Sequence, residues 1–381
     1  MSAIRVALVV GEPSGDTLGA ELIDEIRRLS PGAEFVGMAG PKMIAAGCRA
    51  LANSDELAVM GLLEVLRHYP RLKKLQRALI GQFISDPPDV FVGIDVPDFN
   101  FGIERRLKAA RIPTVHYVCP QAWAWRAARA RKLTEVVDLL LALLPFEPEF
   151  FQQFGVPTQF VGHPLARKVE VERKADVAKQ TLGLPTDASV LAILPGSRTQ
   201  EVKRMASPFL RGAVKVVERQ ENLIPVACVA QAAHISLVRE IADHLGLTDL
   251  EILCGQASSL LQAAEVALTS SGTVTLEAAL AKCPQVVGYR MNPVSFEILR
   301  RLVTVEHIAM PNIISESDLV PELIQTDLTG ERVASAAMRW LRDPAACAKY
   351  QQKCVALHDQ LASDGELAAR AVLGMVERTG G

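Results

Sequence analysis

The chain has 381 residues, a formal net charge of −2, and a composition of 49% hydrophobic and 22% charged residues. These values are typical of a globular protein with room for two or three domains. They argue against a protein that coats nucleic acid, which needs a broad basic surface, and no apolar run reaches the ~18 residues that span a membrane. The seven cysteines are scattered without a C-x-x-C pair, so neither structural zinc nor a disulfide framework is predicted and a cytoplasmic protein is expected.

In the first half of the chain, short β-rich runs alternate with helical segments. The runs are RVALVV (5–10), EFVGMAG (34–40), DVFVGID (89–95), IPTVHYV (112–118), DLLLALLPF (138–146) and QFVGHP (159–164). The first run leads into a helix whose apolar face contains Leu22, Ile26 and Leu29. Apolar runs separated by helices predict parallel strands that are buried on both faces.

The same pattern restarts in the second half, after the charged linker KVEVERKADVAKQ (168–180). Its strands are predicted in SVLAILPGSR (189–198), PVACVA (225–230), EILCG (251–255), VALTSSG (266–272) and PQVVGYR (284–290). The predicted fold class is therefore α/β, with two Rossmann-like, doubly wound domains that face a cleft. Their expected boundaries are residues 1–164 and 165–345, and residues 346–381 form a C-terminal helical segment.

The loop after the first strand, GEPSGD (11–16), is a glycine-rich crossing from strand to helix. Such crossings often hold phosphate, but this one has no G-x-G-x-x-G pattern and no Gly-Lys-Ser/Thr ending. It offers Glu12, Ser14 and Asp16 instead. These side chains bring hydrogen-bonding groups but not the positive charge of the lysine that a phosphate loop carries.

Two stretches of the second half suit a nucleotide diphosphate. In TSSGTVTLEAALAK (269–282), Ser271, Gly272 and Thr273 open a helix whose free N–H groups and partial positive charge favour an anion. Glu277, one turn further on, is positioned to accept hydrogen bonds from ribose hydroxyls, although it fits a solvated helix acid as well.

The other stretch is LPGSRTQEV (194–202). Gly196 and Ser197 allow the backbone to approach a ligand closely, and Arg198 brings a planar cation suited to phosphate oxygens. A simple turn is the alternative for this stretch taken alone. Two such loops at strand ends of one domain favour the nucleotide.

Acidic side chains follow a strand of the first half in VGIDVPDFN (92–100). Asp95 ends the strand, and Asp98 and Asn100 come directly after it. An acid at this place can act as a general base toward a hydroxyl. A metal site built on the two carboxylates lacks supporting His or Glu spacing, and Asp98 alone fits a helix cap.

A hydrolase triad of Ser14 with His116 or His163 is a further alternative. The nucleophile-elbow pattern G-x-S-x-G is absent, because Gly11 and Ser14 are separated by one residue too many. The triad is therefore not favoured.

Taken in order, several motifs resemble one family. They are GEPSGD, AVMGLLEVL, GIDVPDFN, HYVCPQAWAWR, LLPFE, FVGHPL, LPGSR, SSGTVTLEAAL, AKCPQVVGYR and MPNII. This ordered set, spread over residues 5–315, is similar to lipid-A-disaccharide synthase, a two-Rossmann-domain (GT-B type) glycosyltransferase of bacterial outer-membrane lipid assembly. Each motif alone is weak evidence for the family, whereas the ordered set is specific to it.

The resemblance implies a reaction and roles for the candidate residues. The reaction joins UDP-2,3-diacylglucosamine to 2,3-diacylglucosamine 1-phosphate (lipid X) and gives a β(1→6)-linked disaccharide 1-phosphate and UDP, with inversion and without metal or cofactor. Asp95 is then the base, Arg198 stabilises the diphosphate and Glu277 holds the ribose. Further residues expected in the substrate site are Glu12, Ser14 and Asp16 of the first loop, which faces sugar, together with Asp98, Asn100 and Asn312 of MPNII. The family also implies a homodimer that exchanges C-terminal parts.

Two other functions remain open at this point. A related transferase places N-acetylglucosamine on a lipid-linked peptidoglycan precursor, but the acceptor-side motifs quoted above are not those of that enzyme. A nucleotide-sugar-binding regulator without catalysis is disfavoured by Asp95.

The acylated substrates also imply work at an anionic membrane surface, as a peripheral protein of the inner membrane. The segment 57–77 combines apolar residues with a basic run: Met60, Leu62, Leu63, Val65, Leu66, Arg67, Arg71, Lys73, Lys74 and Arg77. A second group follows: Trp123, Trp125, Arg126, Arg129, Arg131 and Lys132. Apolar residues flanked by cations suit an interfacial segment, and ordinary core packing with a solvated basic face is the alternative.

Overall fold

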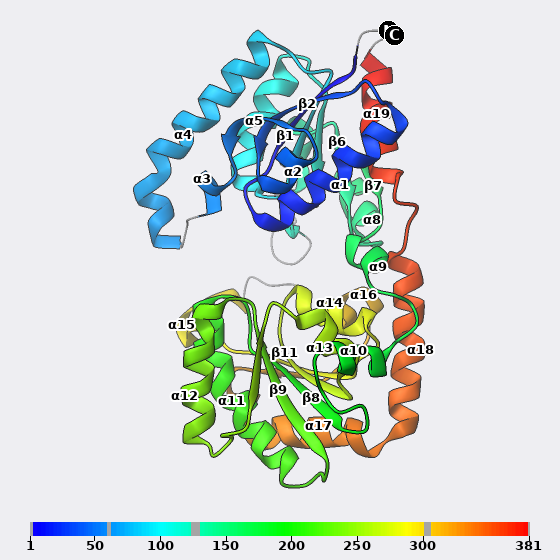
Figure 1. Ribbon diagram of the computed structural model, residues 1–381. Coiled ribbons are helices and arrows are strands. Elements are labelled where there is room, and N and C mark those ends of the chain that lie inside the picture. The colour runs from blue at the N-terminus through cyan, green and yellow to red at the C-terminus, as the bar shows by residue number, and fades with distance from the viewer. Residues whose placement is uncertain (1–2, 59–61, 123–129, 301–305, 380–381) are drawn as a thin grey trace. The chain divides into compact units, whose positions relative to one another are not determined.

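The computed structural model describes residues 3–58, 62–122, 130–300 and 306–379. The chain forms two compact units, one of residues 1–164 together with 361–381 and the other of residues 165–360. Each unit is a parallel sheet covered by helices (Figure 1). Of the final helices, α18 (Pro344–Leu361) belongs with the second unit and α19 (Leu367–Thr379) with the first.

The described residues of the first unit form a seven-stranded sheet in which neighbouring strands are parallel. In spatial order the strands are β3 (Arg49–Asn53), β2 (Glu34–Ala39), β1 (Arg5–Val9), β4 (Val90–Ile94), β5 (Thr114–Tyr117), β6 (Leu139–Ala142) and β7 (Thr158–Phe160).

Helices cover both faces of this sheet. On one face lie α1 (Pro13–Leu29) and α19, and on the other lie α4 (Leu62–Ser85) and α5 (Pro97–Ala109). Strand β1 serves both layers, because Val6 and Leu8 pack on the α1 side and Ala7 and Val9 on the α5 side. Burial on two faces explains why RVALVV is apolar at successive positions. The shorter helices of the unit are α2 (Pro41–Ala45), α3 (Asp55–Ala58) and α8 (Glu147–Gln152).

The described part of the second unit contains a six-stranded parallel sheet. Its spatial order is β10 (Glu251–Cys254), β9 (Leu223–Val229), β8 (Ser189–Leu194), β11 (Val266–Ser270), β12 (Gln285–Tyr289) and β13 (Glu322–Ile324). The helices are α9 (Pro164–Lys168), α10 (Ala175–Thr181), α11 (Thr199–Val217), α12 (Ile235–His244), α13 (Ala257–Ala263), α14 (Thr273–Leu280), α15 (Pro293–Leu299), α16 (Met310–Ser315), α17 (Gly330–Arg342) and α18. Helices α11 and α17 approach closely at Gly212, where a Cβ would lie 2.4 Å from Val333 Cγ1.

The α/β prediction is confirmed, and each strand expected from an apolar run is present. The sequence analysis missed β3 and β13. Both are edge strands, and their residues are exposed or half-buried, so they carry no continuous apolar run. Among the described residues, no helix is both long and apolar enough to cross a bilayer.

Candidate active site

The candidate residues of each unit lie where its strand order reverses. In the first sheet, β1 and β4 are neighbours, but the chain continues from β1 to β2 on one side and from β4 to β5 on the other. In the second sheet, β8 and β11 are related in the same way. Loops diverge at such a reversal, and doubly wound sheets bind ligands there. The motifs GEPSGD and DVPDFN flank the first reversal, and LPGSR and SSGT flank the second.

Asp95 directly follows β4 and has an unusual backbone. Asp95 and Val96 both have left-handed φ angles, 54° and 45°, which non-glycine residues rarely adopt. The Asp95 amide donates to Tyr117 O (2.9 Å), and the Val96 amide donates to Asp95 Oδ1 (2.8 Å). Oδ2 of this half-buried carboxylate has no hydrogen-bond partner among the described residues. Such strain costs about 1–3 kcal/mol per residue and clusters at functional sites.

Asn100 is fully buried on α5 and ties strand ends together. Its Nδ2 donates to Asp95 O (2.8 Å) and lies 3.3 Å from Val9 O and 3.4 Å from Ile94 O. A side chain without exposed surface does not reach a sugar, so the structure makes Asn100 a support of the Asp95 loop. Asp98 is exposed in the first turn of α5 and does not cap that helix, because the N-cap residue is Val96.

Gly11 brings the loop after β1 against the loop after β4. A Cβ at Gly11 would lie 2.7 Å from Leu57 Cδ1 and 2.9 Å from Val96 Cγ2, so a larger residue would separate the loops. Glu12 and Ser14 follow with exposed side chains at the start of α1. These two residues and Asp98 are the exposed polar groups that the sequence placed here.

Asp16, the third polar residue of the first loop, has a different task. It is 3% exposed, and its carboxylate accepts hydrogen bonds from Lys42 N (2.9 Å) and Met43 N (3.0 Å). These amides begin α2, so Asp16 caps that helix from outside. The predicted sugar contact is therefore not supported for Asp16.

The loop after β8 turns through Gly196, whose φ is 122°. The amides of Ser197 and Arg198 both donate to Glu201 Oε2 at 3.2 Å, so Glu201 occupies the donors that the sequence assigned to phosphate. The Arg198 side chain is 82% exposed and lies 3.5 Å from Glu201 Oε1. Its guanidinium is therefore exposed to solvent, whereas the two amides are occupied by Glu201.

The start of α14 is open to solvent. Gly272, the N-cap residue, has a φ of 138°, and Thr273 beside it is exposed. The first amides of a helix lack intrahelical acceptors, so this end can bind an anion. Glu277 is half-buried one turn further on, and burial raises the pKa of its carboxyl. Ser271 is partly committed elsewhere, because its Oγ donates to Ile308 O (2.8 Å).

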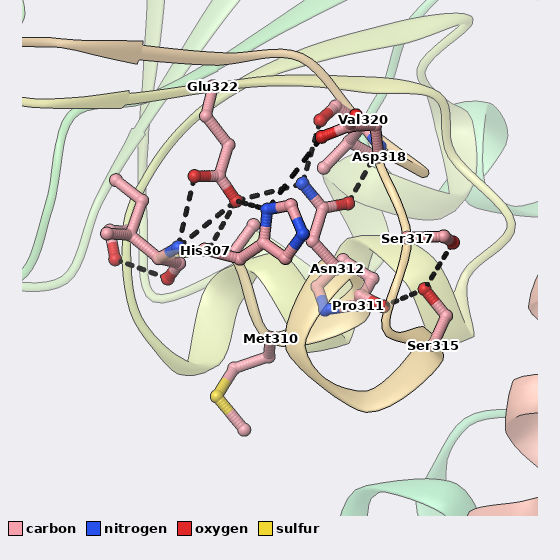
Figure 2. A network of polar contacts seen from close by, with 12 residues as sticks. His307, Met310, Pro311, Asn312, Ser315, Ser317, Asp318, Val320 and Glu322 are labelled. Atoms are coloured by element: carbon pink, nitrogen blue, oxygen red, sulfur yellow. Dashed lines mark hydrogen bonds and ion pairs between the residues drawn. The ribbon is translucent and has the colours of Figure 1, made fainter. Parts of the chain in front are cut away.

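Asn312 on α16 is the centre of the polar network in Figure 2. It is fully buried, its Nδ2 donates to Val320 O (2.9 Å) and Glu322 Oε1 (2.8 Å), and its Oδ1 accepts from Val320 N (2.8 Å). Glu322 also accepts from the amides of Ile308 (3.0 Å) and Ala309 (2.9 Å). Asn312 therefore shapes the segment 308–322 and does not present its amide to a ligand.

This network is fixed to the start of α14. The amide of Met310 donates to Thr275 Oγ1 (3.1 Å), alongside the bond from Ser271 to Ile308. The sequence analysis overlooked both Thr275 and Glu322. Glu322 lies on the unpredicted strand β13, so no pattern linked it to the nucleotide loops.

A buried, hydrogen-bonded pair behind the Asp95 loop was also overlooked. Glu104 on α5 and His116 on β5 have no exposed side-chain surface, and Glu104 Oε1 lies 2.8 Å from His116 Nδ1. Burial raises the pKa of the Glu104 carboxyl, against the lowering effect of His116. His116 Nε2 has no partner among the described residues, so the Ser14–His116 triad is not formed.

No group of three or more His, Cys, Asp and Glu side chains suited to a metal is found in the described ranges. Part of the predicted membrane surface, namely Met60, Trp123, Trp125, Arg126 and Arg129, lies outside those ranges.

Residues 6–373 match the family model described as lipid-A-disaccharide synthetase. The lipid-A-disaccharide synthase of Alkalilimnicola ehrlichii is 46% identical over 371 residues, which cover 96% of this chain and 97% of the relative. Those of Xanthomonas campestris pv. campestris and Pectobacterium carotovorum are 44% and 42% identical and align with 99% and 98% of this chain and 86% and 98% of their own.

Solved structures of low identity share the fold. A UDP-GlcNAc 2-epimerase from Neisseria meningitidis, bound to UDP-GlcNAc, matches with a TM-score of 0.65 at 11% identity and covers 98% of this chain and 100% of its own. The calicheamicin glycosyltransferase CalG4 matches with a TM-score of 0.62 at 16% identity and covers 100% of both chains. The fold is thus of the GT-B type.

Proposed function

The chain belongs to the lipid-A-disaccharide synthetase family, the glycosyltransferases of lipid A biosynthesis, and on this premise we propose its reaction. It transfers the sugar of UDP-2,3-diacylglucosamine to lipid X and gives the β(1→6) disaccharide 1-phosphate and UDP. The main observation in support is the pair of strand reversals. The first bears the acid Asp95 on a strained backbone, and the second bears an open helix start at Gly272 and the exposed Arg198.

Asp95 is the general base in this proposal. The acceptor oxygen attacks the anomeric carbon from the face opposite UDP, the bond from that carbon to the diphosphate breaks, and the hydroxyl proton passes to the Asp95 carboxylate. A single displacement of this kind inverts the anomeric centre. The uncommitted Oδ2 of Asp95 supports the assignment, as does the fixed backbone that carries it.

The second unit stabilises the leaving UDP. Negative charge grows on the diphosphate as the sugar departs, and fixed positive charge there lowers the barrier. Arg198 and the amides at Gly272 and Thr273 supply that charge, so the reaction needs neither metal nor cofactor. Glu277 accepts from the ribose hydroxyls, and Gly196 and Ser197 hold the turn that presents Arg198.

Sugar contacts come from the exposed residues of the first unit, Glu12, Ser14 and Asp98. Asp16, Asn100 and Asn312 act indirectly, through the helix cap, the Asp95 loop and the 308–322 segment. A structure of the same fold solved with UDP-GlcNAc supports a UDP-sugar as the donor.

Product analysis tests the reaction. Incubation with both lipid substrates should give a disaccharide 1-phosphate and one UDP per bond formed, detected by mass spectrometry. Turnover with UDP-N-acetylglucosamine and a lipid-linked peptidoglycan precursor would favour the related transferase. UDP-sugar binding without product would instead indicate a regulator.

We further propose that the protein acts at the inner membrane, as a peripheral homodimer. Tyr69 is a 54% exposed aromatic residue, and Arg71, Lys74 and Arg77 follow it with exposed side chains on α4. Aromatic and cationic groups together favour an anionic lipid surface.

Co-sedimentation with vesicles tests this association, and light scattering gives the oligomeric state. Pelleting should require anionic lipid, weaken with salt, and weaken further in an Arg71/Lys73/Lys74→Ser variant. Absence of pelleting with every vesicle would contradict the association.

A further inference from the structure

The buried pair Glu104–His116 is connected to Asp95 from two directions. Along α5, Glu104 lies one turn after Asn100, whose amide donates to Asp95 O (2.8 Å). Along β5, His116 precedes Tyr117, whose carbonyl accepts from the Asp95 amide (2.9 Å). The 2.8 Å contact between Glu104 and His116 joins these two paths and closes a ring. We call these five residues the Asp95 ring.

The space for this ring is made by Gly93, which is paired in register with His116. A Cβ at Gly93 would lie 2.2 Å from Glu104 Oε1 and 3.0 Å from Asn100 Cβ. The ring of Phe101 lies against that of His116, with 4.8 Å between centroids. The pair is therefore held in one arrangement by packing as well as by its hydrogen bond.

A net gain in folding stability does not explain why these two polar side chains are buried together. Removing two titratable groups from water costs free energy that offsets most of their mutual attraction, and apolar residues of similar volume often serve equally well. What the pair does provide is a fixed distance between α5 and β5. Asp95 and Val96 are strained, so their conformation persists only while both neighbours hold it.

We propose that Glu104 and His116 are positioning residues, which set the direction of the Asp95 carboxylate toward the acceptor hydroxyl without touching substrate. The proposal rests on the role of Asp95 as base given above. A base must be held within a fraction of an ångström of its productive place, and a misplacement of about 1 Å costs on the order of 100-fold in rate.

The first experiment uses Glu104→Gln, which keeps the size of the side chain and one hydrogen bond but replaces the carboxyl group with an amide that cannot ionise. We expect kcat to fall by about tenfold to 100-fold. The KM for the UDP-sugar and the Kd for UDP should change by less than about twofold, because the nucleotide loops belong to the second unit. Rates are expressed per folded molecule, from circular dichroism and the melting temperature.

A double-mutant cycle separates positioning from general damage. In an Asp95→Asn background there is no base to position, so Glu104→Gln should lower the residual rate by less than about twofold. An equal factor in both backgrounds would overturn the inference alone. Full activity of Asp95→Asn would overturn the assignment of the base and the inference with it.

A matched control comes from the second unit. Lys179 and Glu265 form a largely buried pair at 3.0 Å, with side-chain exposures of 7% and 33%. Glu265→Gln should lower the melting temperature and leave kcat unchanged. If Glu104→Gln does not fold, Phe101→Leu loosens the packing on His116 and should give the same fall in kcat with unchanged KM; an unchanged kcat there contradicts the inference.

Discussion

The two units use one scaffold, a parallel sheet with a strand reversal, but their loops differ in charge and in backbone. The first reversal carries acids, Glu12 and Asp95, whereas the second carries Arg198 and an open helix start at Gly272. A sheet of this order decides where a ligand binds, and the loops decide which ligand. This difference supports the proposal that the first unit binds the sugar that reacts as nucleophile and that the second unit binds the departing diphosphate.

The backbone difference has the same origin. In the second unit, glycines take the positive φ values, 122° at Gly196 and 138° at Gly272, at no steric cost. In the first unit, Asp95 and Val96 do so at φ values of 54° and 45°. A phosphate is bound by bare backbone, which glycine exposes. The base that we propose at Asp95 needs a side chain at that point, which accounts for a strained residue other than glycine there.

Asp95→Asn should have the largest effect. The amide keeps the shape but cannot take the proton, so kcat should fall by roughly 10²–10⁴-fold. UDP affinity, measured by calorimetry, should stay within about twofold because the nucleotide loops are unaltered. Asp98→Asn is the control, and loss of turnover there with normal turnover in Asp95→Asn would move the base to Asp98.

Arg198→Ala should have the second-largest effect on the rate. Its guanidinium stabilises charge that appears in the transition state, so kcat should fall by about 10²–10³-fold, as for other such donors. Arg211→Ala, an exposed arginine of the same region of the chain, should leave the rate unchanged. A larger effect on KM than on kcat would mean that Arg198 binds ground-state substrate.

Glu277→Ala should chiefly weaken UDP binding, because ribose contacts change little during the reaction. Hydrogen bonds to a charged group contribute about 1.5–3 kcal/mol, which corresponds to about 10–100-fold in Kd. Glu240→Ala, at an exposed helix acid of the same unit, is the control. An unchanged Kd would remove Glu277 from the site.

The same residue predicts a pH dependence. Burial raises the pKa of Glu277 above the ordinary carboxyl value of about 4.3. Because burial favours the protonated form, the contribution of this group to the stability of the ligand-free protein is fully present below the ordinary pKa and is lost as pH rises from there through the raised pKa. UDP binding should change in the opposite direction, stronger as pH rises through that window, and Glu277→Gln should abolish this pH dependence.

Asp16→Ala should affect stability and leave catalysis intact. Loss of a helix cap costs about 0.5–2 kcal/mol, measured as a shift in the urea midpoint. Turnover per folded molecule and KM should match the parent. A raised KM for lipid X at normal stability would restore Asp16 to the sugar site.

The smallest effect is expected from EDTA. In the proposal, Arg198 and the helix start of the second unit take the place of a metal ion. Turnover should therefore be unchanged after chelation and after Mg²⁺ is added back. Strong inhibition that Mg²⁺ reverses would show that Arg198 and the helix start do not suffice.

The sequence by itself determined the scaffold and the chemical character of the loops. Apolar runs such as RVALVV must be buried on both faces, and this requirement alone predicts a parallel sheet with helices. The glycine and arginine of LPGSR and the acids of DVPDFN keep their chemical character whatever the tertiary structure. These motifs follow their strands directly, so their place at the carboxyl edge could be predicted as well.

Only the tertiary structure decided which polar residues face a ligand. Asp16, Asn100 and Asn312 were predicted substrate contacts, but each is buried and hydrogen-bonded to the backbone of another segment. The pairing of Glu104 with His116 had no local signal, because it depends on a contact between α5 and β5. Burial and long-range hydrogen bonds depend on how elements pack, and a pattern along the chain does not record that packing.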